Sequence, residues 1–95
     1  MSATGDLLAF AGARHVLPQA ARADALRLLG DTLAVGAAGV GAPGEAAILA
    51  AARAMGSGAE ARLIGTGERL PAPAAAFVNG YRIHCLEWDA VHEPA

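Results

Sequence analysis

The chain contains no lysine and few aromatic side chains: all seven of its basic residues are arginine, and Phe, Tyr and Trp make up 4% of its 95 residues. Without lysine, the chain alone has no amine for a Schiff base or for a lysine general base. Seven basic and nine acidic residues give a net charge of −2, without the basic surface of a nucleic-acid-binding protein. We therefore expect neither a nucleic-acid partner nor lysine-dependent catalysis.

Cysteine and long apolar runs are also scarce. Cys85 is the only cysteine, which excludes an internal disulfide and is typical of a reducing compartment. Charged residues interrupt every apolar run before the ~18 residues needed to cross a membrane. The N-terminal segment carries an acid, Asp6, instead of the basic region of a secretory signal. We expect a cytoplasmic protein without a membrane partner.

Small apolar residues dominate what is present. The chain is 55% hydrophobic and 17% charged, with a mean hydropathy of +0.39. A free-standing domain of this size needs more polar residues to cover its surface. We therefore expect a homo-oligomer, or a missing C-terminal segment that covers part of this apolar surface.

The spacing of apolar residues predicts one all-α domain over residues 1–95. Helices are expected over about 4–13, 19–38, 44–55 and 73–89 or beyond. In the second helix, Leu26, Leu29 and Leu33 form an apolar stripe, and we expect its C-terminal half to be buried on most sides. Gly36 and Gly39 would let another helix approach closely.

The stretch 59–69 predicts a short extended piece and a turn. Residues 62–64 form the extended piece, and Gly65-Thr66-Gly67 forms the turn. A Gly-x-Gly triplet alone is a weak signal for phosphate binding, because the rest of a nucleotide fingerprint is missing. We expect no nucleotide cofactor here.

Chemically reactive side chains are concentrated in residues 74–95, which hold two of the three histidines and the only cysteine, tyrosine and tryptophan. On a continuous helix, His84 and Glu87 would lie one turn apart at a site for polar substrate groups. The alternative is that Glu87 only pairs with His84 or with an arginine. Asn79-Gly80 indicates either a tight helix contact or a kink that turns the amide of Asn79 toward a site.

Other side chains of this segment have simpler explanations. Cys85, Asp89 and His92 have the spacing of three ligands on one helix, but cysteine is frequently just a small buried residue, and we expect no metal. Tyr81 and Trp88 are expected to be core or interface anchors. His15, far from this segment, is expected at the surface or as a capping residue.

The order of motifs in this segment matches a known signature. Ala75-Ala76, Asn79-Gly80, His84 and Glu87-Trp88-Asp89 follow one another, and this order and spacing resemble the signature region of the MmgE/PrpD family. That family includes 2-methylcitrate dehydratase, cis-aconitate decarboxylase and iminodisuccinate epimerase. The stretches 29–33 and 63–67 are similar to two earlier family segments.

This sequence also departs from the family pattern. Glu87 stands where the family usually has Asp, and Val91 stands at a common hydroxyl position. The His-Pro pair and the later His, Lys and Tyr residues of the family are not in the chain. We therefore expect an N-terminal fragment of the family's helical domain that is inactive alone.

The resemblance implies a lyase or isomerase that acts on small di- or tricarboxylates by abstracting a proton next to a carboxylate, without metal or cofactor. It implies Glu87, Asp89 and His84 as catalytic residues and Asn79 as a substrate-binding residue. The choice between dehydration, decarboxylation and epimerisation stays open. The alternative is a non-catalytic helical module whose apolar faces serve assembly.

Overall fold

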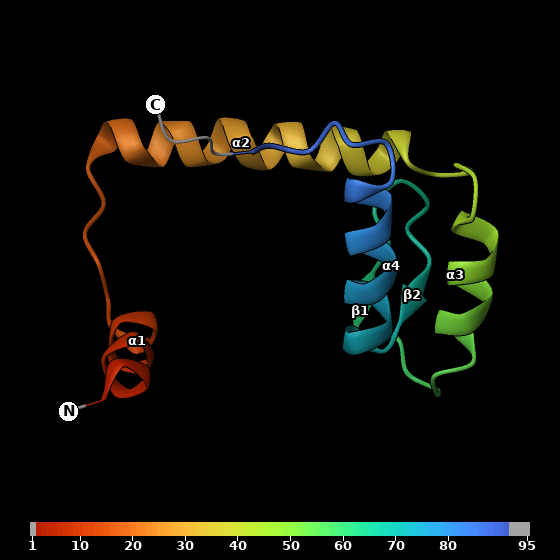
Figure 1. The fold of residues 1–95 in the computed structure, drawn as a ribbon, viewed down its shortest axis with the longest axis horizontal. Coiled ribbons are helices and arrows are strands. Elements are labelled where there is room, and N and C mark those ends of the chain that lie inside the picture. The colour runs from red at the N-terminus through yellow and green to blue at the C-terminus, as the bar shows by residue number, and fades with distance from the viewer. Residues whose placement is uncertain (1, 92–95) are drawn as a thin grey trace.

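A computed structural model describes residues 2–91 and has an all-α fold with one short hairpin (Figure 1). The elements are α1 (Ala3–Gly12), α2 (Gln19–Ala38), α3 (Glu45–Arg53), β1 (Ala61–Arg62), β2 (Arg69–Leu70) and α4 (Ala72–His84). The predicted fold class is confirmed. The predicted extended piece over 62–64 overlaps β1 only at Arg62. β1 and β2 pair antiparallel, with Ala61 opposite Leu70.

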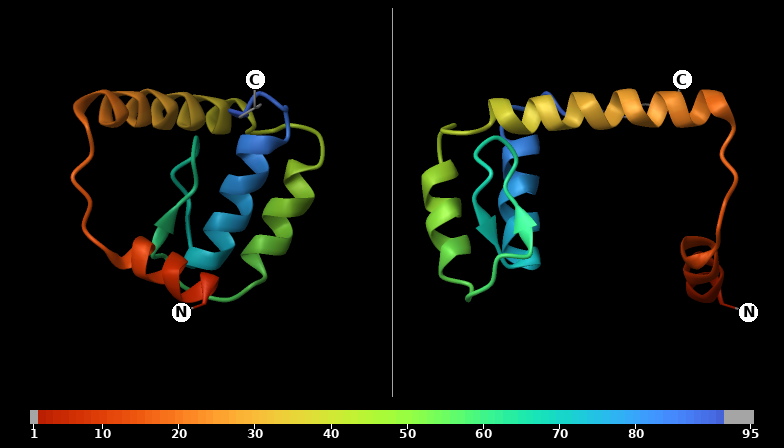
Figure 2. Two further views of the ribbon diagram at one scale, coloured as in Figure 1. Left: turned by 60° about the vertical axis from the view of Figure 1, so that its left-hand side comes forward. Right: turned by 180° about the vertical axis from the view of Figure 1, so that it is seen from behind.

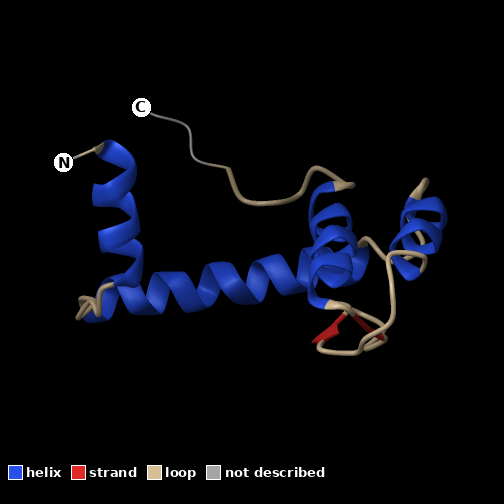
Figure 3. Ribbon diagram, turned by 90° about the horizontal axis from the view of Figure 1, so that it is seen from below, coloured by secondary structure: helices blue, strands red, loops and turns tan. Residues whose placement is uncertain are grey.

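The elements divide into two regions of different character. The C-terminal end of α2, α3, the hairpin and α4 form a compact lobe, whereas α1 stands apart at the far end of α2 (Figures 1 and 2). We call residues 35–84 the lobe and residues 2–34 the arm. Figure 3 shows the arm from below, with α1 and the lobe at opposite ends of α2.

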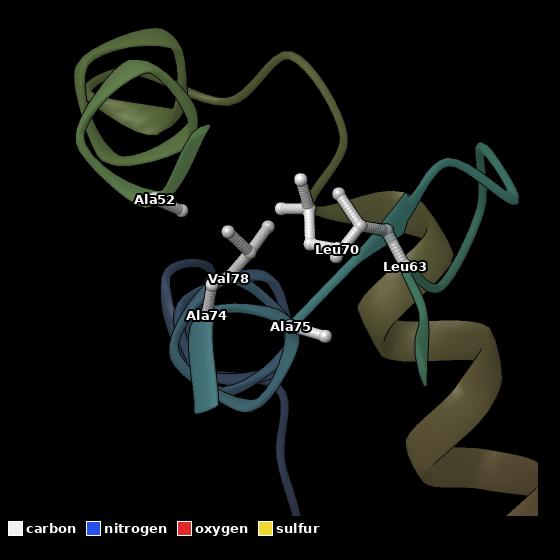
Figure 4. Packing of buried hydrophobic residues seen from close by; sticks show 6 residues of the cluster. All are labelled: Ala52, Leu63, Leu70, Ala74, Ala75 and Val78. Atoms are coloured by element: carbon white, nitrogen blue, oxygen red, sulfur yellow. The ribbon is translucent and has the colours of Figure 1, made fainter. Parts of the chain in front are cut away.

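The hydrophobic core lies where α3, the hairpin and α4 meet (Figure 4). Leu63 and Leu70 project from the hairpin onto the buried face of α4, and Ala52 closes the core from α3. On α4 the buried residues recur at helical spacing: Ala74, Ala75 and Val78. Because most of these side chains are small, the two helices and the hairpin pack closely around a small core.

Two glycines let α2 pack directly on the lobe. A Cβ added at Gly36 would lie 3.0 Å from Cγ2 of Ile64, and a Cβ at Gly39 would overlap the carbonyl oxygen of Arg82. The predicted close approach at these glycines is therefore confirmed. The last turn of α2 is fixed against the end of α4.

The rest of α2 has no such support. None of residues 2–34 is buried, and the side chains of the apolar stripe are largely exposed, at 60% for Leu26, 54% for Leu29 and 45% for Leu33. The prediction that the C-terminal half of α2 is buried on most sides holds only for the last turn of the helix. For the turns before it, the prediction is wrong. The lobe covers only that turn, and no other described element reaches the turns before it.

Local hydrogen bonds define the ends of α1. The hydroxyl of Ser2 accepts a hydrogen bond from the backbone N–H of Gly5 at 3.0 Å, which caps the start of the helix. At the other end, Nε2 of His15 donates to the carbonyl oxygen of Phe10 at 2.8 Å. The predicted capping role of His15 is confirmed. Within residues 2–91, no helix has both the length and the apolar character needed to cross a membrane.

Candidate functional site

Helix α4 ends at His84, five residues before the end that the sequence predicts. The chain then turns, with the backbone N–H of Glu87 donating to the carbonyl oxygen of His84 at 2.9 Å. Glu87 has a positive φ of 57°, a conformation that usually falls to glycine at a helix C-terminus. Trp88 beyond it is 64% exposed. The prediction of a helix through Asp89 is wrong, because the positive φ of Glu87 turns the chain out of the helical path.

The turn brings His84 and Asp89 together instead of His84 and Glu87. Nδ1 of His84 lies 3.2 Å and 3.1 Å from the two carboxylate oxygens of Asp89. The side chain of His84 is 72% exposed, whereas that of Asp89 is 27% exposed. With the proton on Nδ1 held by the carboxylate, Nε2 carries the lone pair of the neutral ring.

The contact changes the pKa of both groups. The hydrogen bond that Nδ1 of His84 donates to Asp89, followed by the negative charge of Asp89, raises the pKa of His84 above the ordinary 6.5. The same hydrogen bond lowers the pKa of Asp89 below the ordinary 3.8. Glu87 adds only the weakest of the influences on His84. Within residues 2–91, its carboxylate forms no ion pair or hydrogen bond.

Asn79 lies on the face of α4 that contacts the hairpin. Its Nδ2 donates to the carbonyl oxygen of Arg62 at 3.0 Å, and its Oδ1 accepts from the backbone N–H of Ile64 at 2.8 Å. The amide therefore clamps the hairpin to α4. Gly80 beside it faces open space, so the prediction of a tight helix contact at that glycine is wrong. A substrate contact of Asn79 stays a prediction.

Sequence reasoning missed the most buried charged pair of the lobe. Arg82 is 1% exposed and Glu45 is 5% exposed. Nε of Arg82 donates to Oε1 of Glu45 at 2.8 Å. Nη2 of Arg82 lies 2.6 Å from the same oxygen. The available signal was a single arginine one turn after Val78 on the apolar face of α4.

The remaining nitrogen of Arg82 ties the pair to the hairpin turn. It donates to the carbonyl oxygen of Ile64 at 2.8 Å and to the hydroxyl of Thr66 at 3.1 Å. A buried charge pair is stable only when its hydrogen-bonding groups are satisfied, and no buried side-chain nitrogen or oxygen in the described part of the chain lacks a partner. Arg82 therefore joins α3, α4 and the hairpin two residues before His84.

The other predicted residues of the segment are placed as follows. Cys85 is half-buried, and its thiol donates to the carbonyl oxygen of Arg82 at 3.6 Å. Tyr81 donates to the carbonyl oxygen of Pro43 at 2.6 Å, which confirms it as an anchor, whereas the exposed Trp88 is not a core residue. His92 lies outside the described residues. Residues 2–91 contain no pocket and no group of three side chains with metal-binding geometry.

A comparison with known proteins gives a family match that includes the lobe and the arm from residue 11 onward. A family model described as the MmgE/PrpD N-terminal domain matches residues 11–95. No match was found among curated proteins or solved structures. The matched range contains α2, the whole lobe and the contact between His84 and Asp89. The chain therefore belongs to the MmgE/PrpD family.

Proposed function

We propose that this chain supplies the proton-transfer residues of the active site of a lyase or isomerase that acts on small di- or tricarboxylates. The observation that carries this proposal is the contact between Nδ1 of His84 and the carboxylate of Asp89 at 3.1 Å. It joins two side chains of the family signature at the exposed end of a helix. Glu87, between them in sequence, adds a second acid near this position.

The pair has the chemistry of an oriented general base. Asp89 fixes the ring of His84 with its proton on Nδ1, so that Nε2 is the atom that takes a proton from a carbon next to a substrate carboxylate. The negative charge of Asp89 stabilises the imidazolium that forms, in agreement with the raised pKa of His84. Because His84 is largely exposed, its ring is accessible to a substrate placed beside α4.

The chain does not supply every group that such a reaction needs. Arg82, the cation nearest to His84 in sequence, is buried against Glu45 and has no face left for a substrate carboxylate. Groups that bind the carboxylates must come from a second chain or from a further segment. We therefore propose no turnover by the 95-residue chain alone.

A second candidate function is a non-catalytic assembly module. The exposed leucines of α2 favour it, because large apolar side chains in a row on a helix are usually covered by another protein surface. The two functions differ in whether His84 and Asp89 affect chemistry.

The experiment uses a chimera in which residues 11–95 replace the matching segment of the N-terminal domain of a complete MmgE/PrpD enzyme. The readout is exchange of the substrate proton next to the carboxylate with deuterated solvent. We expect His84→Gln to reduce exchange by about 10²- to 10⁴-fold, the usual contribution of a general base. Asp89→Asn should reduce it less and should shift the pH profile toward lower pH, because the pKa of His84 falls when the carboxylate is removed.

Two controls make the result decisive. Glu60→Gln removes an exposed carboxylate elsewhere on the lobe and should leave exchange unchanged, and the 95-residue chain alone should show none. Equal exchange rates in the parent chimera and in the His84→Gln and Asp89→Asn variants, all folded, would remove the proposed chemistry and leave the assembly function.

A further inference from the structure

The position of His84 depends on the last turn of α4. The side chain of His84 is 72% exposed, and within residues 2–91 its hydrogen bonds go only to Asp89 in the following turn. These hydrogen bonds fix the two side chains to each other but do not connect them to the core. A general base has to lie within hydrogen-bond reach of the proton that it takes. The place of Nε2 therefore depends on what holds the backbone of residues 82–85.

Arg82 holds this turn through its backbone. A Cβ at Gly39 would overlap the carbonyl oxygen of Arg82, so α2 and α4 touch directly at this point, where the ends of the two helices meet in Figure 1. The same carbonyl oxygen accepts the hydrogen bond of the Cys85 thiol. The last turn of α4 therefore has no room to shift toward α2.

The side chain of Arg82 holds the same turn against two further elements. Nε and Nη2 contact Oε1 of Glu45, which is the first residue of α3. Nη1 donates to the carbonyl oxygen of Ile64 and to the hydroxyl of Thr66 in the turn of the hairpin. All three nitrogens of a planar, rigid guanidinium thus have a fixed partner. The turn that carries His84 is held against α2, α3 and the hairpin at once.

Stability alone is a weak reason for this buried pair. Apolar side chains of similar volume often replace a buried ion pair without loss of stability, and Val78, one turn before Arg82, already belongs to an apolar core. Apolar packing has no preferred direction, whereas the hydrogen bonds of a guanidinium require one geometry. The pair of Arg82 and Glu45 therefore specifies where the end of α4 lies, which apolar packing would define less closely.

We propose that Arg82 is a positioning residue for proton transfer by His84. It holds the last turn of α4 at the place from which His84 reaches both Asp89 and a substrate. Arg82 contacts no substrate itself, because its guanidinium is buried. The inference rests on the proposed function of His84 and Asp89, and it adds a residue that acts on them only through the backbone.

The test uses the same chimera and the same exchange of the substrate proton. Arg82→Met combined with Glu45→Leu removes the hydrogen bonds of the pair and leaves no unpaired buried charge. We expect this double variant to fold and to exchange about 10- to 10²-fold more slowly than the parent chimera, because a misplacement of about 1 Å can cost about 10²-fold.

A conservative substitution provides a second measurement if the double variant does not fold. Arg82→Lys keeps the charge of the pair, so Glu45 is not left alone. The single nitrogen of lysine cannot take the places of all three guanidinium nitrogens. Arg82→Lys should therefore also slow the exchange, by a smaller factor than the double variant.

The lobe offers a matched control pair. Arg53 and Glu68 also join α3 to the hairpin, with Nε of Arg53 at 2.8 Å and its Nη2 at 2.6 Å from the carboxylate. In the described part of the chain, this pair forms no hydrogen bond to α4. Arg53→Met combined with Glu68→Leu should therefore leave the exchange unchanged. An equal loss in this control would show a general effect of removing an ion pair and would overturn the inference.

The pKa of His84 separates positioning from a general loss of stability. It is measured by NMR titration of the ring protons in the 95-residue chain. Asp89 raises this pKa, so a displaced turn should let it fall toward the ordinary value and should shift the pH profile of exchange in the chimera toward lower pH. The double variant removes one charge of each sign, so a change in net charge does not cause the fall.

The outcomes separate this inference from the proposed function. If His84→Gln leaves the exchange unchanged, the proposed function and the inference fail together. If His84→Gln slows the exchange while the folded Arg82 variants exchange at the parent rate, only the inference fails. An unchanged pKa of His84 in the double variant overturns the inference as well.

Discussion

The lobe and the arm belong to one continuous chain, and α2 runs through both of them. In the lobe, every helix contacts another element, and a charged pair is buried with all its hydrogen bonds satisfied. In the arm, none of residues 2–34 is buried, and the contacts that exist are local. The same helix is thus fixed by tertiary packing at one end and held only by its own hydrogen bonds at the other.

This difference predicts where substitutions are costly. Helices of this length gain most of their stability in proteins from packing and not from intrinsic propensity. A change in the lobe should therefore reduce the free energy of unfolding strongly, whereas a comparable change in the arm should hardly affect it.

The largest effect is expected for the buried charged pair. Arg82→Ala leaves Glu45 charged, buried and without its partner, which should reduce the free energy of unfolding by about 3–5 kcal/mol. Arg27→Ala in the arm removes an exposed pair with Asp24 and should cost about 0.5 kcal/mol or less. Urea denaturation followed by circular dichroism measures both.

A double variant sharpens this test. Arg82→Met combined with Glu45→Leu removes both charges and should recover most of the stability lost in Arg82→Ala, because no unpaired buried charge remains. Equal losses in Arg82→Ala and Arg27→Ala would contradict the division into lobe and arm.

A pair of glycine substitutions in α2 should change stability in opposite directions. Gly39→Ala places a methyl group on the carbonyl of Arg82 and should cost at least about 1–3 kcal/mol, as overpacking does. Gly30→Ala meets no atom within 4 Å, so it should stabilise the helix by up to about 1 kcal/mol. Thermal melts of the two variants check the signs, and a loss of stability in Gly30→Ala would show that the arm is packed.

The smallest effect is expected at the turn after the lobe. Glu87 has a φ of 57°, which costs a residue with a side chain about 1 kcal/mol more than glycine. Glu87→Gly should therefore raise the free energy of unfolding by up to that amount, whereas Glu87→Ala keeps the cost and should change little. Lower stability in Glu87→Gly than in Glu87→Ala would contradict the backbone cost, because neither variant keeps the carboxylate and the two differ only in conformational freedom and one methyl group.

Local sequence signals predicted the elements well. Pro18 and Gly39 mark the two ends of α2, so the predicted range 19–38 agrees with the structure. The end of α4 carries no glycine or proline, and the positive φ falls on Glu87 instead. Without such a residue, the local sequence gives no signal for the end of α4 at His84.

Contacts between distant residues limited the prediction of the site. His84 and Asp89 were both identified, but a continuous helix would have put them on different faces, so their pairing was missed. Glu45 and Arg82 are 37 residues apart in sequence, and spacing on one helix carries no information about such a pair. The substrate contact of Asn79 stays a prediction, and the hydrogen bonds of its amide to backbone groups of the hairpin were not foreseen.

The contact between Gly39 and the carbonyl of Arg82 has a mechanical consequence. It fixes the last turn of α2, a helix about 30 Å long, at one point of the lobe. A tilt of about 10° at this point would move the far end of the helix, and α1 with it, by about 5 Å. A substitution at Gly39 that tilts α2 would therefore shift residues that Gly39 never touches.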